Sequence, residues 1–196
     1  MNILGVILAG GLARRMGGGD KALIVLGGRT LLDRAVERLS PQVDAVVINA
    51  NDDPARFGSA LPVIPDLDDS RAGPLAGVLA GLDHAQRQGA SHIVTVAVDT
   101  PFFPRDLVAR LREAATERAV SLACAKTGER THPVFGLWPV SLAEDLRAAM
   151  GDGMRKVDRW TASHGCAEAV FEPVPFDPFF NVNTPEDLTE AEGLLA

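Results

Sequence analysis

The chain has 196 residues, a formal net charge of −7 and a pI of about 5.1. An acidic balance of this size disfavours general binding to nucleic acid or to a membrane surface, because both attract proteins with net basic fields. No apolar run approaches the roughly 20 residues of a bilayer-spanning helix, and the apolar start lacks the preceding basic segment of a signal peptide. We therefore expect a cytoplasmic protein whose anionic ligands are held by a local group of cations.

Apolar residues predict strands and helices that alternate along the chain. The continuous apolar run from Ile3 to Ala9 ends at glycines, which is typical of a strand buried on both faces of a parallel sheet. Further strands are predicted at 44–50, 61–64, 93–98, 120–125, 133–138 and 167–171, and helices at 31–39, 74–85, from Pro104 onward, at 141–150, at 154–160 and after an N-cap at Thr184. This alternation predicts a three-layer α/β/α protein with a mostly parallel sheet. Because no repeat or linker interrupts it, we expect a single domain over residues 1–196.

The segment LAGGLARRMGGGDK at residues 8–21 follows the first strand and combines glycines with three cations. Glycines let the chain turn sharply and bring N–H groups close to a ligand, and ligands of open α/β sheets lie beyond the carboxyl ends of the strands. With Arg14, Arg15 and Lys21 beside it, this turn favours a phosphate chain. Neither GxGxxG nor GxxxxGK[ST] fits the segment. A glycine-rich surface turn with solvated arginines is the alternative interpretation.

Polar residues at the ends of two later segments are candidates for the same site. Asp99 follows the predicted strand IVTVAV, where an acid can bind a hard cation such as Mg²⁺ that bridges phosphates. A turn or N-cap aspartate before Pro101 is the alternative. Asn181 and Asn183 flank Val182, so in extended chain their amides point the same way and can complete a metal or phosphate shell. Alternatively, Asn183 only precedes the last helix.

Asn49 and Asp66 each end or follow a predicted strand, at the edge where Gly10 lies. A carboxylate can accept hydrogen bonds from two neighbouring donors of a ligand at once. A polar turn residue is the other interpretation of Asp66, because PDLDDSRAG is rich in loop formers. The block GPLAG at 73–77 places small residues at a helix start, which favours an anion or forms only a tight loop.

Taken together, these segments resemble the molybdenum cofactor guanylyltransferases, which are nucleotidyltransferases with a Rossmann-like, nucleotide-diphospho-sugar transferase fold. LAGGLARRMGGGDK is similar to the signature loop of that family, and VVINAN (46–51), PD (65–66), GPLAG (73–77), VDTPF (98–102), THP (131–133) and NVNTPEDL (181–188) are similar to its other blocks, in order. The blocks cover nearly the whole chain. Gly10 favours this family over related cytidylyl- and sugar-activating enzymes, which usually have LAAG there. Where the family usually has a cysteine before DTP, this chain has Val98, whose side chain we expect in the core.

The resemblance implies transfer of GMP from GTP to the terminal phosphate of molybdopterin, with release of pyrophosphate. It implies Mg²⁺ on Asp99, with Mn²⁺ as a substitute, and catalytic roles for Arg15, Lys21 and Asp99; the RMG signature selects Arg15 over Arg14. The implied nucleotide- or pterin-binding residues are Leu8, Ala9, Gly10, Gly11, Lys21, Asn49, Asp66, Gly73, Pro74, Leu75, Gly77, His132, Asn181 and Asn183. Cofactor-delivery proteins and recipient molybdoenzymes are the implied protein partners.

The cysteines and the remaining histidines suggest no further chemistry. Cys124 and Cys166 are far apart and form no CxxC motif, so we expect two free thiols in a reducing compartment. His84, His92 and His164 fall in a predicted helix, at a strand start and in a loop, so the histidines are not expected to form a metal site.

Four other functions stay open at this point. Two are close: a molybdopterin cytidylyltransferase, and a nucleotidyltransferase acting on a sugar or polyol phosphate. The third is a nicotinamide-dependent oxidoreductase, which the missing GxGxxG motif opposes. The fourth is a nucleotide-sensing module without catalysis.

Overall fold

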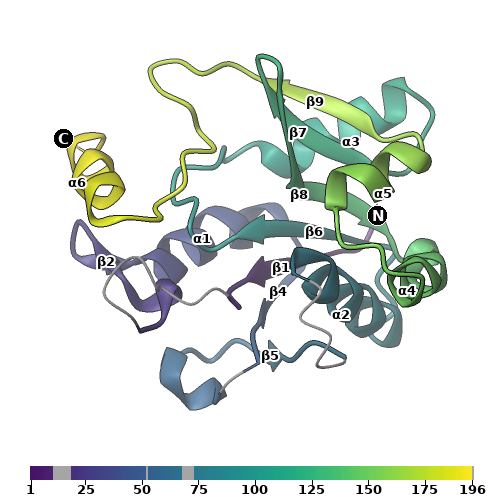
Figure 1. The fold of residues 1–196 in the computed structure, drawn as a ribbon, viewed down its shortest axis with the longest axis horizontal. Coiled ribbons are helices and arrows are strands. Elements are labelled where there is room, and N and C mark those ends of the chain that lie inside the picture. The colour runs from purple at the N-terminus through teal and green to yellow at the C-terminus, as the bar shows by residue number, and fades with distance from the viewer. Residues whose placement is uncertain (11–18, 52, 68–72, 196) are drawn as a thin grey trace.

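The computed structural model describes residues 1–10, 19–51, 53–67 and 73–195. A seven-stranded sheet forms its centre, with the strand order β5-β4-β1-β6-β8-β7-β9 (Figure 1). The strands are β1 (Ile3–Leu8), β4 (Ala45–Asn49), β5 (Val63–Ile64), β6 (His92–Ala97), β7 (Ala123–Thr127), β8 (Arg130–Pro139) and β9 (Ala167–Phe171). Among these described strands β8 runs antiparallel to both neighbours, and the other pairs are parallel. The prediction of a mostly parallel α/β sheet is therefore confirmed.

Helices cover both faces of the sheet, as predicted. The helices are α1 (Leu31–Leu39), α2 (Pro74–Arg87), α3 (Leu107–Glu117), α4 (Ala143–Gly151), α5 (Val157–Ser163) and α6 (Pro185–Gly193), and short 3-10 helices occur at η2 (Lys21–Leu23), η3 (Ser40–Gln42), η4 (Pro54–Phe57) and η5 (Val140–Leu142). The apolar sides of α1 and α3 join one core cluster, and those of α2, α4 and α5 join a second one. α6 packs beside a hairpin of β2 (Val25–Leu26) and β3 (Arg29–Thr30). In the described part of the chain, no helix has both the length and the apolar content that crossing a membrane requires.

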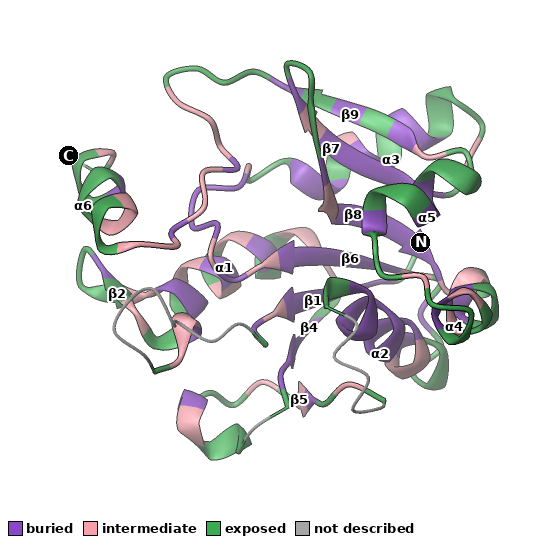
Figure 2. Cartoon of the chain, viewed as in Figure 1, coloured by how far each residue is buried: buried purple, intermediate pink, exposed green. Residues whose placement is uncertain are grey.

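Side chains alternate between two core clusters on the two faces of the sheet, and most of β1 is buried (Figure 2). In β1, Ile3 and Ile7 belong to the cluster under α1 and α3, whereas Leu4 and Val6 belong to the cluster under α2. Burial on both faces explains why this strand is a continuous apolar run in the sequence. Val98 is buried in the first cluster, which confirms the expectation for that position.

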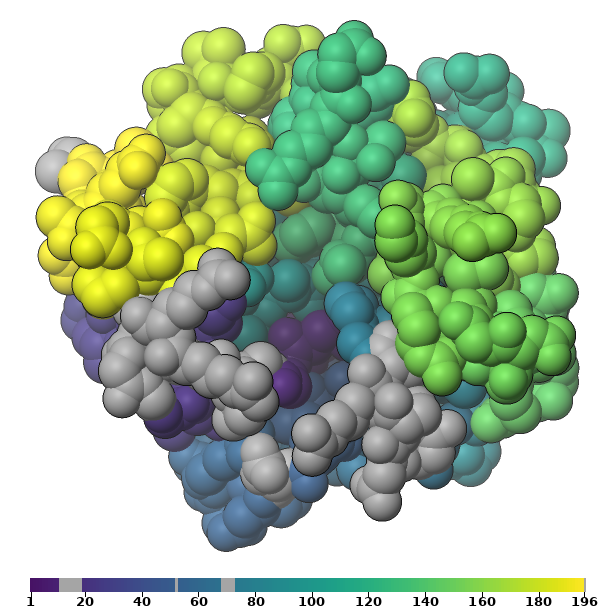
Figure 3. Space-filling model, in the orientation of Figure 1, coloured from purple at the N-terminus to yellow at the C-terminus, as the bar shows by residue number. Residues whose placement is uncertain are grey.

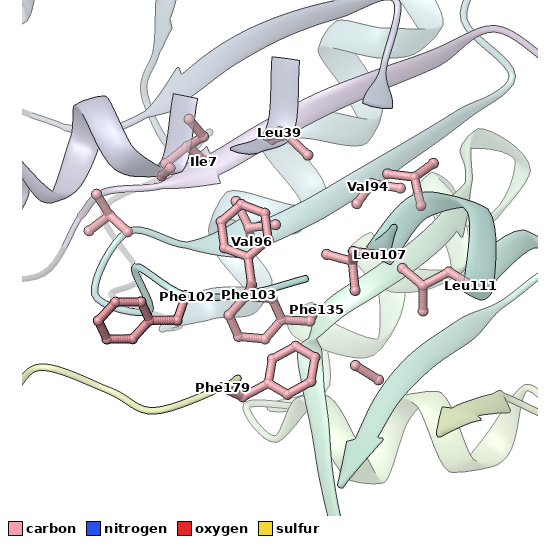
Figure 4. Packing of buried hydrophobic residues seen from close by; sticks show 14 of the residues in the cluster. Ile7, Leu39, Val94, Val96, Phe102, Phe103, Leu107, Leu111, Phe135 and Phe179 are labelled. Atoms are coloured by element: carbon pink, nitrogen blue, oxygen red, sulfur yellow. The ribbon is translucent and has the colours of Figure 1, made fainter. Parts of the chain in front are cut away.

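Aromatic rings anchor the segment after β9 in the first cluster (Figure 4). The fully buried ring of Phe179 lies 4.9 Å from that of Phe135 and 5.4 Å from that of Phe171, between centroids. Val182 is also fully buried, and its N–H donates to the carbonyl of Asp99 at 2.8 Å. The segment 179–183 is therefore fixed at the end of β6, although it is neither helix nor strand.

Several local features differ from the sequence-based expectations. The strand predicted at 120–125 starts at Ala123, and the helix predicted at 154–160 starts at Val157. The helix expected to open at Pro104 begins at Leu107 instead, so that prediction was wrong. The carbonyl of Pro104 accepts from the N–H of Leu107 in a preceding turn, and Gln42 Oε1 accepts from the N–H of Val108 in the first helical turn. The β2–β3 hairpin was not predicted, because strands of two residues are too short to show alternation.

Candidate functional site

The carboxyl ends of the parallel strands bring the predicted site residues to one edge of the sheet. Leu8 at the end of β1 is in register with Asn49 of β4 and with Ala97 of β6. The N–H of Ala9 donates to the carbonyl of Asn49 at 2.9 Å. This face is hollowed near its centre, where the purple N-terminal residues lie deeper than the yellow and green segments around them (Figure 3). The expected common edge is therefore present.

Gly10 leaves open space at this edge. A Cβ atom built on it would meet no atom of the described residues within 4 Å, and its φ lies outside the left-handed region. Neither the backbone conformation nor the neighbouring atoms therefore require a glycine. A residue without a side chain does, however, let a ligand approach the backbone closely. The predicted residues Gly11, Arg14 and Arg15 lie outside the described residues.

Lys21 joins two distant segments of the chain at this edge. Its Nζ donates to Asp99 Oδ2 at 2.7 Å and to Asn183 Oδ1 at 2.5 Å. The side chains of Lys21 and Asp99 are only 12% and 19% exposed, so this ion pair is largely shielded from water. Asn181 Nδ2 donates to Asp99 Oδ1 and to Thr100 Oγ1, both at 3.0 Å. We call these five residues the Lys21 cluster.

The geometry of the Lys21 cluster confirms that the two asparagine amides share one side of the segment. Val182 between them points the other way, into the core. Thr100, which is fully buried, was not predicted as a site residue, and its hydroxyl lies 3.3 Å from Asp99 Oδ1. Its place directly after Asp99 was the only sequence signal, and a threonine before a proline is equally typical of a turn.

The oxygens of the Lys21 cluster fit a divalent cation. The Lys21 ammonium bridges a carboxylate oxygen and an amide oxygen, so these two oxygens already bind a cationic group. Oxygens of this kind are the ligands that Mg²⁺ uses in proteins, usually together with substrate phosphates and water. Among the described residues, no group of three or more His, Cys, Asp or Glu is placed to hold a metal. A cation at Asp99 could take its other ligands from amide oxygens of the cluster, from substrate phosphates and from water.

A second group of polar residues lies at the ends of β4 and β5. Asn49 is buried, at 5% exposure, and its Nδ2 donates to the carbonyl of Ile64 at 3.2 Å and to Asp66 Oδ1 at 3.0 Å. Asn51 Nδ2 donates to Asp66 Oδ2 at 2.8 Å, and the N–H of Asp66 donates to Asn51 Oδ1 at 2.7 Å. Asn49 and Asp66 are therefore brought together as predicted, and Asn51 was missed. The spacing NAN, which matches that of NVN at 181–183, was a signal for it.

The start of α2 lies beside Asn49. Gly73 is its N-cap, with φ of 66° and ψ of −147°, a conformation that an L residue adopts only with strain. Pro74 occupies the first turn, and Leu75 is fully buried, so only the backbone of Leu75 could contact a ligand. A Cβ atom on Gly77 would lie 2.2 Å from Asn49 Oδ1. Gly77 is therefore required for close packing of the helix on Asn49.

His132 lies in the core rather than among these polar groups. Its ring is 6% exposed, stacks on Phe179 at 4.4 Å between centroids, and its Nε2 lies 2.7 Å from Thr127 Oγ1. Burial lowers the pKa of His132 below its usual value of 6.5; the carboxylate of Asp177 opposes this shift and Arg130 adds to it. The structure shows a packing role, and the predicted contact with a pterin stays a prediction.

An ion pair links the residue before Lys21 to the chain after β4. Asp20 Oδ1 accepts from the N–H of Ala22 and so caps η2, and Asp20 Oδ2 pairs with Arg56 Nε at 2.7 Å. Both side chains are mostly buried, at 14% and 21% exposure. Sequence reasoning missed this pair because nothing in the local pattern around residue 56 indicates its partner. The contact holds the segment that carries Lys21 against the half of the edge that carries Asp66.

Comparison with known structures defines the class of protein first. A CMP:2-keto-3-deoxy-manno-octonic acid synthetase complexed with CTP has the same fold, with a TM-score of 0.74 at 13% identity, over 100% of this chain and 98% of that one. A molybdopterin-guanine dinucleotide biosynthesis protein A from Archaeoglobus fulgidus is similar at a TM-score of 0.77 and 25% identity, over 98% of each chain. The fold is that of the nucleotidyltransferases.

Sequence comparison then defines the family. A model of the MobA-like NTP transferase domain matches residues 5–167. A molybdenum cofactor guanylyltransferase from Bradyrhizobium sp. (strain ORS 278) is 55% identical, over 98% of this chain and 92% of the relative. A molybdenum cofactor guanylyltransferase from Cereibacter sphaeroides is 50% identical, over 100% of this chain and 98% of the relative. The chain belongs to the MobA-like NTP transferase family, and its resemblance to the molybdenum cofactor guanylyltransferases is confirmed.

Proposed function

We propose that this protein is a nucleotidyltransferase that transfers GMP from GTP to the terminal phosphate of molybdopterin and releases pyrophosphate. The observation that carries the proposal is the contact of Lys21 with Asp99 and Asn183, beside the open backbone of Gly10. This arrangement supports the proposal, because it joins one cation and a set of hard oxygen donors at the carboxyl edge of the sheet, where ligands of open α/β folds bind. The names of the relatives supply the two substrates.

The chemistry needs charge stabilisation more than it needs a general base. The second pKa of a phosphate monoester is about 6, so the attacking phosphate is already ionised at neutral pH. The reaction brings two anions together, and Lys21 and Arg15 lower that barrier by neutralising the triphosphate and the departing pyrophosphate. Mg²⁺ or Mn²⁺ held by Asp99, with Asn183 as a second oxygen donor, would supply further positive charge to the transferring phosphoryl group.

The two ends of the site receive different parts of the substrates. Asp66, held by Asn49, accepts the two donors of guanine. The start of α2, from Gly73 to Gly77, offers backbone N–H groups to an anionic or polar part of the nucleotide or the pterin. We place the reaction in the cytoplasm, because Cys124 and Cys166 are both free, as a reducing compartment favours. Delivery proteins and recipient molybdoenzymes would then collect the product.

Nucleotide selectivity tests this proposal most directly. Calorimetric titration with GTP, CTP and UTP in the presence of Mg²⁺ should show the tightest binding for GTP, and Asp66→Ala should remove most of that preference. Asp53→Ala is the control, because Asp53 is an exposed aspartate on the connection between β4 and β5, and its carboxylate accepts from the N–H of Ala55. Release of pyrophosphate from GTP should require molybdopterin. Binding of CTP as tight as that of GTP would rule out the guanylyl assignment.

A further inference from the structure

The carboxylate of Asp66 is held from two sides by side-chain amides. Each of its oxygens accepts one hydrogen bond, Oδ1 from Asn49 at 3.0 Å and Oδ2 from Asn51 at 2.8 Å. The amide of Asn51 also accepts from the backbone N–H of Asp66 at 2.7 Å. The side-chain amide of Asn51 therefore binds both the carboxylate and the backbone N–H of Asp66, in a closed ring of two hydrogen bonds.

The orientation of the Asn51 amide follows from these partners. Its oxygen faces an N–H donor and its nitrogen faces a carboxylate, and the reversed orientation would lose both hydrogen bonds. The terminal torsion of an aspartate side chain otherwise has a broad, roughly two-fold distribution. Two amide donors on opposite oxygens hold that torsion in one position. The free lone pairs of the carboxylate then point in a fixed direction.

The number of acceptors left on Asp66 matches guanine and no other common base. A carboxylate has about four lone-pair sites, so two of them stay available, one on each oxygen. Guanine presents N1–H and the 2-amino group side by side, whereas hypoxanthine keeps N1–H and lacks the amino group. Recognition of both donors requires both oxygens to be in place at once. Loss of either amide contact would therefore affect guanine more than hypoxanthine.

We propose that Asn51 is a positioning residue which fixes the Asp66 carboxylate and thereby sets the preference for guanine over hypoxanthine. The proposal rests on the proposed function, in which Asp66 contacts the base. Asn49 cannot do this alone, because it reaches only Oδ1. Asn51 is exposed and contributes little to the core, so its effect on the site is separable from its effect on folding.

The test compares the binding of GTP and ITP, whose bases differ only in the 2-amino group, in the presence of Mg²⁺. In Asn51→Ala, we expect the dissociation constant for GTP to rise about five- to tenfold, on the scale of one ordinary hydrogen bond, and that for ITP to rise less. The ratio of the two constants should fall, and Asn51→Ser should behave in the same way. Asn2→Ala is the control, since Asn2 is an exposed asparagine before β1, at the opposite end of that strand. The thermal midpoint should not change in any of these variants.

A double mutant separates positioning of Asp66 from any other role of Asn51. In an Asp66→Ala background, Asn51→Ala should change the GTP constant by less than about twofold, because the group that it positions is gone. An unchanged GTP-to-ITP ratio in Asn51→Ala, or a full additional loss in the double mutant, would overturn the inference while leaving the guanylyl assignment intact. A wild-type protein that prefers CTP to GTP would overturn both.

Discussion

At the scale of single residues, Lys21 connects parts of the chain that are 78 and 162 residues away from it. Its ammonium lies between a carboxylate and an amide oxygen, largely out of water, where a charge interacts more strongly than it does at the surface. In the proposed reaction, an incoming triphosphate would compete with Asp99 for this cation. We therefore expect the role of Lys21 in the reaction to depend on its position in the site as well as on its charge.

Replacement of Lys21 by alanine should lower kcat/KM at least about tenfold, because one charge-assisted contact to the transferring group is lost. Turnover is measured as pyrophosphate released from GTP in the presence of molybdopterin. Arg147→Ala is the matched control, because Arg147 forms an ion pair of the same length, 2.7 Å, with Asp83 between α4 and α2. Unchanged turnover in Lys21→Ala would contradict the role proposed for it.

Replacement of Gly77 by alanine should destabilise the fold by about 1–3 kcal/mol, as overpacking does. It should also weaken GTP binding, because the new methyl group would displace Asn49 and with it Asp66. Gly81→Ala on the same helix places a methyl group 2.8 Å from Val6 and should cost similar stability with GTP affinity unchanged. Urea unfolding and calorimetry together measure both effects. Equal losses of affinity in the two variants would show that Gly77 acts only through the core.

The sequence predicts the edge of the sheet well and the contacts across it poorly. The alternation of strands and helices places Asn49, Asp66 and Asp99 at or shortly after the carboxyl ends of parallel strands, and these ends meet at one edge of the sheet. The same pattern does not show that Arg56 pairs with Asp20, because side-chain contacts between connecting segments depend on how those segments fold back. The first turn of α3 was misplaced for a similar reason, since Gln42 supplies its hydrogen bond from another element.

At the scale of elements, the start of α6 fixes the backbone of Asn183. Asp187 Oδ2 accepts from the N–H groups of Asn183 and Thr184 at 2.8 and 2.9 Å, and Thr184 Oγ1 accepts from the N–H of Asp187 at 3.2 Å. This capping box confirms the helix start that was predicted at Thr184. The amide oxygen that contacts Lys21 thus belongs to a residue held by a helix terminus.

Replacement of Asp187 by alanine should cost about 1 kcal/mol of stability and lower turnover about three- to tenfold, because Asn183 loses its support. Asp33→Ala is the control, since Asp33 closes the same kind of capping box with Thr30 at the start of α1. We expect a similar loss of stability there and turnover within about twofold of the wild type. The thermal midpoint and pyrophosphate release measure the two quantities. If Asp187→Ala lowered only stability, α6 would have no part in the site.

At the scale of the whole molecule, one sheet separates two apolar cores and places the polar groups at a single edge. The strand pattern and the continuous apolar runs made this arrangement predictable. That residues 1–196 form one domain stays a prediction. The core also contains His132, and its protonation links the stability of the whole fold to pH.

The free energy of unfolding should decrease as pH falls below about 6.5, the usual value for histidine. Burial lowers the pKa of His132 in the folded protein, so the unfolded chain binds a proton that the folded chain does not. The stabilisation is complete above that pH and is lost below it, by at most about 1.4 kcal/mol per pH unit. Urea unfolding between about pH 5 and 7 should give a shallower slope for His132→Gln than for the wild type. Part of the slope should remain, because burial also lowers the pKa values of His84 and His92. Identical slopes for the two proteins would refute the assignment.

The buried ring of Phe179 and the buried side chain of Val182 affect the entropy cost of binding a ligand at Asn181 and Asn183. Residues in irregular chain usually keep conformational freedom, and ordering one of them when a ligand arrives costs on the order of 1–2 kcal/mol for its backbone. Here that ordering is complete when the protein folds, because the hydrophobic core secures the chain on both sides of Asn181. The two asparagine amides are therefore preorganised, and in the proposed function a nucleotide would bind them without a further entropic cost for ordering this segment.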